Sequence, residues 1–131
     1  MALQLKVDIV TPERAAFRGP AAQVVVPAWN GELGILPEHD AVLCLLRAGT
    51  CQVFTESDVV RYVIGPGFAE IGQDHVTILT NACEEVSKID KASAARELQA
   101  AESEMTVHDT FSEKYRQAQL AAEHARARLD A

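Results

Sequence analysis

The side chains that most often do chemistry are concentrated in one short stretch of the sequence. Glu38, His39 and Asp40 follow one another directly, and carboxylates beside an imidazole are groups that bind metal ions or move protons. Adjacent side chains of an extended chain point to opposite faces, so these three do not converge easily on one ion. The other histidines are scattered and form no H-E-x-x-H pattern. The sequence therefore predicts neither a metal site nor a catalytic residue here.

Glycines and cysteines also fail to form a recognisable site. Residues 31–34 (Gly-Glu-Leu-Gly) and 65–67 (Gly-Pro-Gly) match neither phosphate-binding glycine pattern, and turns explain both. Cys44, Cys51 and Cys83 have no C-x-x-C spacing and lie in apolar stretches, so they are predicted to be small buried side chains. We expect no cofactor and no enzymatic activity of the chain's own, and a binding module is the better hypothesis.

Composition and charge exclude several classes of partner. The chain has 131 residues, of which 48% are apolar and 24% charged, as in ordinary globular proteins. Its net charge is −7 and it has no basic run, so nucleic acid is not an expected partner. No uncharged apolar run approaches the roughly 20 residues that span a bilayer, and direct membrane insertion is not expected.

The elements that would position any site divide into two parts. All seven glycines lie at or before Gly72, and all five prolines lie at or before Pro66. The later sequence is rich in alanine and lacks both of these turn-forming residues. We therefore predict a β-rich domain over residues 1–86 and a helical domain over residues 87–131.

Short apolar runs separated by turn residues indicate strands in the first part. Leu5, Val7 and Ile9 alternate with charged residues, which is the period of a half-buried strand. Many short strands at near-regular spacing are typical of a β-sandwich or a small barrel. The runs predicted to form two hairpins are 50–55 with 59–64, and 68–71 with 76–79.

Two helices are predicted in the second part. Asp90 can cap a helix over about residues 91–105, and Thr110 or Ser112 can cap a second helix. Apolar residues recur at spacings of three and four, so the two helices are expected to pair as an antiparallel hairpin. The expected seam comprises Ala94, Leu98, Ala101 and Met105 on the first helix, and Phe111, Tyr115, Ala118, Ala122, Ala125 and Leu129 on the second.

The seam of this hairpin is mostly alanine. Alanine favours helix but buries little apolar area, so at about 25 cal/mol per Å² the two helices gain only a few kcal/mol from each other. We therefore expect a hairpin of marginal intrinsic stability, able to dock on the sheet, dock on a partner, or extend.

One loop resembles that of a known family. Residues 30–39 (Asn-Gly-Glu-Leu-Gly-Ile-Leu-Pro-Glu-His) are similar to the loop that marks the ε subunit of F-type ATP synthases, which reads close to G-E-L-G-I-x-P-G-H-A-P. Other segments resemble the family in the same order and at the same spacing, and together they cover nearly all of residues 4–86. These segments are residues 7–13, 17–19, 62–71 and 76–82.

The resemblance implies a fold and a role. The fold would be β + α, an N-terminal antiparallel β-sandwich followed by a C-terminal antiparallel two-helix hairpin. The chain would be a non-catalytic rotor subunit at the foot of the central stalk, binding the γ subunit and the c-ring. It would lie peripherally on the cytoplasmic face of a bacterial inner membrane. In many members the helices extend into the α/β catalytic head and inhibit ATP hydrolysis.

The resemblance also implies contact residues. Glu32 and His39, with Asp40 beside them, are expected to meet the c-ring from one tip of the sandwich. An apolar patch on the sandwich is expected to bind γ, but spacing does not identify its residues. Arg126 and Arg128 are the possible inhibitory contacts with the catalytic head.

Two departures from the family pattern bear on function. Glu38 stands where the family has glycine, and Asp40-Ala41 replaces its Ala-Pro, which makes this loop more acidic. Members that bind ATP on the hairpin carry I/L-D-x-x-R-A, whereas residues 89–94 place Ser93 at the arginine position. A hydroxyl cannot replace the donor fork of a guanidinium, so nucleotide sensing is not expected.

Two hypotheses of other classes are weighed against the rotor subunit. One is an unrelated β-sandwich binding module that dimerises through Phe111, Tyr115 and Leu129 of its hairpin. The other is a small hydrolase whose site the motifs do not reveal, and turnover by the isolated chain would identify it.

Overall fold

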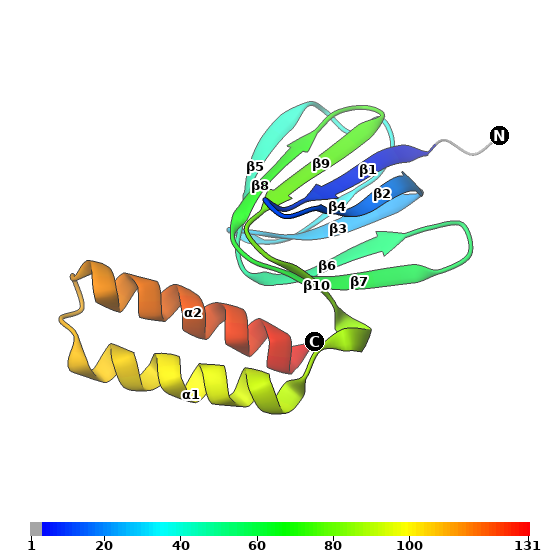
Figure 1. Cartoon of the computed structure of the whole chain (residues 1–131). Coiled ribbons are helices and arrows are strands. Elements are labelled where there is room, and N and C mark those ends of the chain that lie inside the picture. The colour runs from blue at the N-terminus through cyan, green and yellow to red at the C-terminus, as the bar shows by residue number, and fades with distance from the viewer. Residues whose placement is uncertain (1–3) are drawn as a thin grey trace.

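Ten short strands form the first part of the chain in the computed structural model, which describes residues 4–131 (Figure 1). In chain order they are β1 (Leu5–Val10), β2 (Ala15–Ala21), β3 (Gln23–Ala28), β4 (Gly31–Ile35), β5 (Val42–Leu46), β6 (Gly49–Phe54), β7 (Val59–Ile64), β8 (Gly67–Ile71), β9 (His75–Thr80) and β10 (Cys83–Glu85). The strands are arranged as a β-sandwich, which confirms the predicted fold class.

The strand order explains how the two layers are joined. One layer runs β4-β3-β6-β7-β10 and the other runs β5-β8-β9-β1-β2. β3 belongs to both, because its first residues pair with β6 and its last residue, Ala28, pairs with Leu46 of β5. The β1–β9 ladder is parallel, whereas the other ladders are antiparallel. These two strands are far apart in sequence, so no tight turn imposes an antiparallel direction on them.

Alternation of side chains places the core between the layers. Leu5, Val7 and Ile9 are buried, as their period of two predicts, and the core is dominated by valine and isoleucine. The residues of the core cluster come from the β-strands, and no helical residue belongs to it. Cys51 is buried among them, which raises the pKa of its thiol to about 12, so this cysteine is an unreactive core residue.

The predicted hairpins are present, and two strands escaped prediction. β6 and β7 pair in register, as do β8 and β9. β2 was not predicted because it contains Gly19 and Pro20, which strands tolerate chiefly at a sheet edge, and β2 is an edge strand. β10 is too short, at three residues, for its sequence to show a period.

The second part is the predicted pair of helices, α1 (Lys91–Val107) and α2 (Glu113–Asp130), preceded by a short 3-10 turn, η1 (Val86–Lys88). The Asp90 carboxylate caps α1 by accepting hydrogen bonds from the backbone N–H groups of Ala92 and Ser93. Ser112 caps α2, so it is the one of the two predicted residues that does so. α1 runs two residues beyond the predicted end.

The alanine seam forms as predicted except at one position. Ala94, Ala101, Ala118 and Ala125 are buried where α1 and α2 meet. Phe111 is 97% exposed and is not part of the seam. It precedes the Ser112 cap, and its backbone N–H is held by the Asp109 carboxylate in the turn between the helices. The hairpin lies below the sandwich with α2 nearer to the strands (Figure 1).

Gly67 provides a test of the sandwich geometry. A Cβ at this position would overlap the backbone carbonyl of Leu79 on the neighbouring strand, which cannot move without breaking the β8–β9 ladder. We predict that Gly67→Ala lowers the free energy of unfolding by about 1–3 kcal/mol in urea titrations. Gly19→Ala is the control, because its Cβ would meet the Phe17 ring at an ordinary 3.6 Å. Equal effects of the two substitutions would contradict this account.

Candidate functional site

The segment that resembles the family, residues 30–39, consists of β4 and the loop that follows it, which leaves β4 at the end opposite to the α2 cleft. The Glu38 N–H donates a hydrogen bond of 2.7 Å to the carbonyl of Gln73, which ties this loop to the β8–β9 turn. His39 Nδ1 lies 2.7 Å from the carbonyl of Asp40. His75 is the first residue of β9, directly after this turn, and its hydrogen bond with Asp74 raises the pKa of the imidazole. Among residues 4–131, no three potential ligands are grouped closely enough to hold a metal ion.

Glu38 adopts the backbone conformation that the family glycine would suit. Its φ is +70°, in the left-handed region, which costs an L-residue roughly 1–2 kcal/mol. The hydrogen bond to Gln73 holds the residue in this conformation. A glycine at this position would adopt the same φ without that cost.

Glu32 does not share a tip with His39 and Asp40. It lies near the start of β4, opposite Pro27 of β3, at the end of the sandwich that faces α2. The five residues of β4 span roughly 15 Å. Glu32 and His39 therefore do not lie at one tip of the sandwich, because Gly31 to Ile35 form a strand rather than a turn. His39 and Asp40 follow the other end of β4. Contact of these three residues with the c-ring stays a prediction.

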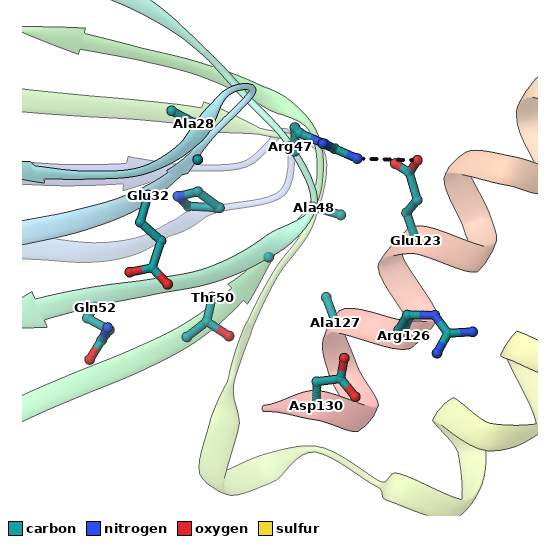
Figure 2. A pocket seen from close by; sticks show the side chains of 13 residues that line it. Ala28, Glu32, Arg47, Ala48, Thr50, Gln52, Glu123, Arg126, Ala127 and Asp130 are labelled. Atoms are coloured by element: carbon teal, nitrogen blue, oxygen red, sulfur yellow. Dashed lines mark ion pairs between the residues drawn. The ribbon is translucent and has the colours of Figure 1, made fainter.

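A cleft of about 460 Å³ separates this end of the sandwich from α2. Glu32, Arg47 and the start of β6 line one side, and Glu123, Arg126 and further residues of α2 line the other. Figure 2 shows Arg47 reaching across the gap toward Glu123, and the two form an ion pair of 3.7 Å. Charges of both signs line the cleft, so it shows no preference for an anionic or a cationic ligand.

The two arginines singled out from the sequence have different surroundings. Arg126 is exposed, and its guanidinium lies 3.8 Å from the Glu102 carboxylate. Arg128 is buried and binds carboxylates of Glu84 and Glu97, each at 2.9 Å. In this conformation of the hairpin, only Arg126 is free to meet another chain.

The sequence reasoning missed the residues of an exposed apolar row on the sandwich. Leu45 of β5 pairs with Phe68 of β8, which pairs with Leu79 of β9, which in turn pairs with Val10 of β1. Their side chains point outward, and the first three are 54%, 46% and 49% exposed. Pro12 and Pro66 border the same surface. We call these four paired residues the apolar row.

A signal for this row was present in the sequence of β5. Its residues, Val-Leu-Cys-Leu-Leu, are apolar at every position. A strand buried on one face needs only alternate apolar residues, so Leu46 enters the core while Leu43 and Leu45 face outward. A continuous apolar run in a sheet whose other strands alternate thus indicates that the outer face of this strand is apolar too, as expected where another surface packs against it.

His124 of α2 is a titratable group inside the hairpin. It is half-buried, and its Nε2 has no hydrogen-bond partner among the described residues. Burial, and then the positive charge of Arg128, lower the pKa of this imidazole. Glu84 and Glu97 oppose that effect without overcoming it. His124 is therefore held neutral when the hairpin is packed.

Comparisons with known proteins agree on one family. A family model described as the ATP synthase, Delta/Epsilon chain, beta-sandwich domain matches residues 4–86. The ATP synthase epsilon chain of Synechococcus sp. (strain WH7803) is 35% identical, covering 98% of this chain and 96% of that protein. The chloroplastic ATP synthase epsilon chain of Guillardia theta is 37% identical, covering 98% of each.

A solved structure shares the fold. One chain of the Euglena gracilis mitochondrial ATP synthase OSCP/F1/c-ring assembly superposes with a TM-score of 0.82 at 24% identity. The match covers 95% of this chain and 78% of that one. Within the described residues, neither helix has the length and apolar character needed to cross a bilayer.

The neutral state of His124 predicts a pH dependence of the hairpin. Its pKa is lower in the packed hairpin than the ordinary 6.5, so packing loses stability as pH falls below about 6.5. We expect amide exchange in α2, corrected for its intrinsic pH dependence, to become faster relative to β9 between pH 7 and pH 5. His124→Gln should remove this change, and the more peripheral His108→Gln should not. Persistence of the change in His124→Gln would contradict the assignment.

Proposed function

The chain belongs to the ATP synthase epsilon-chain family, and we propose that it is a non-catalytic subunit of the central stalk, joining γ to the c-ring of an F-type ATP synthase. The observation that carries the proposal is the apolar row on the outer face of the second layer. The loop 30–39 and the helical hairpin supply the surfaces for its other contacts.

The apolar row suits a lateral contact with γ. It crosses four adjacent strands of a rigid sheet, so its side chains are presented without loop ordering on binding. A contiguous apolar strip at the centre of an exposed sheet costs free energy in water, and soluble proteins keep such strips mainly where a partner covers them. Phe68 lies in the middle of the row and is its natural anchor, since aromatic residues dominate interface energetics.

The β4 edge suits the contact with the ring. His39 and Asp40 lie at one end of this edge and Glu32 at the other, so a contact would involve a line of polar groups rather than one tip. Such groups can hydrogen-bond to the polar loops of ring subunits, and their charges would set orientation more than affinity. This arrangement holds the chain peripherally at the cytoplasmic face of a bacterial inner membrane.

The hairpin suits an inhibitory role toward the catalytic head. Its residues contribute nothing to the core cluster of the sandwich, so residues 1–86 can keep their fold when the helices move. The contact between α1 and α2 is narrow and built from alanine, so separating the two helices exposes little buried apolar area. Extended helices would present Arg126, and Arg128 once freed, to acidic residues of the head.

The contact with γ is tested by a matched pair of phenylalanine substitutions. We predict that Phe68→Ala weakens binding to purified γ by at least about tenfold in calorimetric titrations, because it removes the central side chain of the apolar row. Phe111→Ala, at the exposed turn between the helices, should leave the affinity unchanged. If Phe68→Ala binds γ as the unaltered chain does, this surface is not the contact.

The inhibitory role is tested by adding the chain back to a catalytic head that contains γ but lacks this subunit. We expect the whole chain to slow ATP hydrolysis, and a version ending at Val86 to bind γ without slowing it. Binding of both forms to γ is measured first, so that a missing effect is not a missing complex. Equal slowing by both forms, or none by either, would contradict an inhibitory hairpin.

A further inference from the structure

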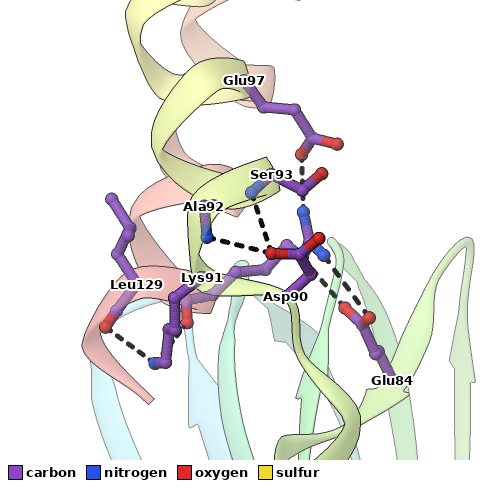
Figure 3. A network of polar contacts seen from close by, with 8 residues as sticks. Glu84, Asp90, Lys91, Ala92, Ser93, Glu97 and Leu129 are labelled. Atoms are coloured by element: carbon purple, nitrogen blue, oxygen red, sulfur yellow. Dashed lines mark hydrogen bonds and ion pairs between the residues drawn. The ribbon is translucent and has the colours of Figure 1, made fainter.

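Three elements of the chain meet at one guanidinium. Arg128, in the last turn of α2, is only 7% exposed. Its Nε donates to Glu84 of β10 at 2.9 Å, and its Nη1 donates to Glu97 of α1 at 2.9 Å. Its Nη2 lies 3.4 Å from the second Glu84 oxygen. One side chain therefore binds the sandwich and both helices at once (Figure 3).

The position of Arg128 is itself held by a second contact. Lys91, the first residue of α1, donates from Nζ to the backbone carbonyls of Arg128, Leu129 and Ala131 at 2.8, 2.8 and 2.6 Å. The last carbonyls of a helix lack partners within the helix and favour a positive charge. Lys91 thus fixes the end of α2 against the start of α1, where the Asp90 cap holds the first turn.

Few other contacts join the hairpin to the sandwich. α2 meets β6 and β7, and the cleft of about 460 Å³ opens beside that contact. Tyr62 and Ile64 of β7 point into the core, so Val63 between them points outward. Val63 is nevertheless fully buried, because the helical side of the molecule covers it. Val63 pairs with Glu84, so the side chain that the helices cover lies next to the carboxylate that binds Arg128.

The remaining ion pair across this interface is weak. Arg47 and Glu123 lie 3.7 Å apart, and their side chains are 58% and 36% exposed. Water screens such a pair, so it contributes little to the attachment. Arg128 is different, because removing one partner of a buried charge leaves the other uncompensated, which is strongly unfavourable. The strength of attachment is therefore concentrated at a single residue.

We propose that Arg128 is the clasp that holds the helical hairpin against the β-sandwich. Loss of its bond to Glu84 releases the hairpin from the sandwich, whereas its bond to Glu97 keeps α1 and α2 together. The clasp consists of the chain's own side chains. This inference goes beyond the proposed function, because it concerns the isolated chain whether or not the helices inhibit.

The test measures how far the hairpin lies from the sandwich in the isolated full-length chain. Spin labels carried on non-natural residues at Ser57, in the β6–β7 turn, and at Phe111, between the helices, report this distance by electron double resonance. We expect one narrow distance distribution for the parent chain. Arg128→Ala and Glu84→Gln should each raise the population of longer distances at least about tenfold.

Matched substitutions distinguish the effect of losing the Arg128 contacts from the effect of losing any charged pair on these helices. Arg126→Ala and Glu102→Gln break the exposed pair on the same two helices and should leave the distribution unchanged. Arg128→Lys keeps the charge but lacks the planar donor fork that places Nε and Nη2 on Glu84 and Nη1 on Glu97, so it should also release the hairpin. If Arg128→Ala fails to fold, the near-isosteric Glu84→Gln still decides the question. The proposal is overturned if Glu84→Gln retains the parent distribution, or if Arg126→Ala shifts it equally.

Amide exchange in the same variants checks the second half of the proposal. In Glu84→Gln, α1 and α2 should remain protected by each other while the outer face of β7 exchanges faster. In Glu97→Gln, protection should fall along the contact between α1 and α2. Protection of β1 and β9 should stay at the parent level in both. Loss of α1–α2 protection in Glu84→Gln would overturn the separate roles of the two carboxylates.

Discussion

Burial of every second side chain between the two β-layers constrains everything else in this molecule. The core takes Leu5, Val7 and Ile9 from β1 and the inward residues of the other strands. Once that register is set, the remaining positions of each strand must face outward. Leu45 and Phe68 are exposed because Leu46 and Ala69 are buried. The surface that we assign to γ is thus a direct result of how the core is packed.

The same constraint explains how the hairpin is attached. Val63 and Glu84 lie on the outer face of the first layer because Tyr62, Ile64 and Cys83 face the core. An alanine seam leaves α2 with little apolar surface to place on that face. The attachment that we propose therefore depends on the buried Arg128 guanidinium, which would lose a charged partner if Glu84 were removed. Such an interface favours two distinct states over gradual loosening.

The core cluster of the sandwich contains no helical residue, and the hairpin joins the sandwich at few points. We therefore describe the sandwich as the rigid part of the molecule and the hairpin as its conditional part. The rigid part carries the apolar row and the β4 edge, both of which need fixed geometry to bind neighbours. The conditional part carries the basic residues of α2 and the neutral His124. With these properties on separate parts, the movement of the hairpin that we propose would leave the apolar row and the β4 edge undisturbed.

The sequence alone is enough to predict the strands with clear alternation, the two helices, the Asp90 cap and the family. These features depend on local chemistry and on ordered motifs, both of which are readable along the chain. It did not reveal β2 or β10, because an edge strand with Gly19 and Pro20 and a strand of three residues show no period. Nor could it place Glu32 and His39 at opposite ends of β4, or bring Arg128 to Glu84 across 44 positions of sequence. These placements are seen only in the folded chain, because contacts between distant segments follow from how the layers stack and not from spacing along the chain.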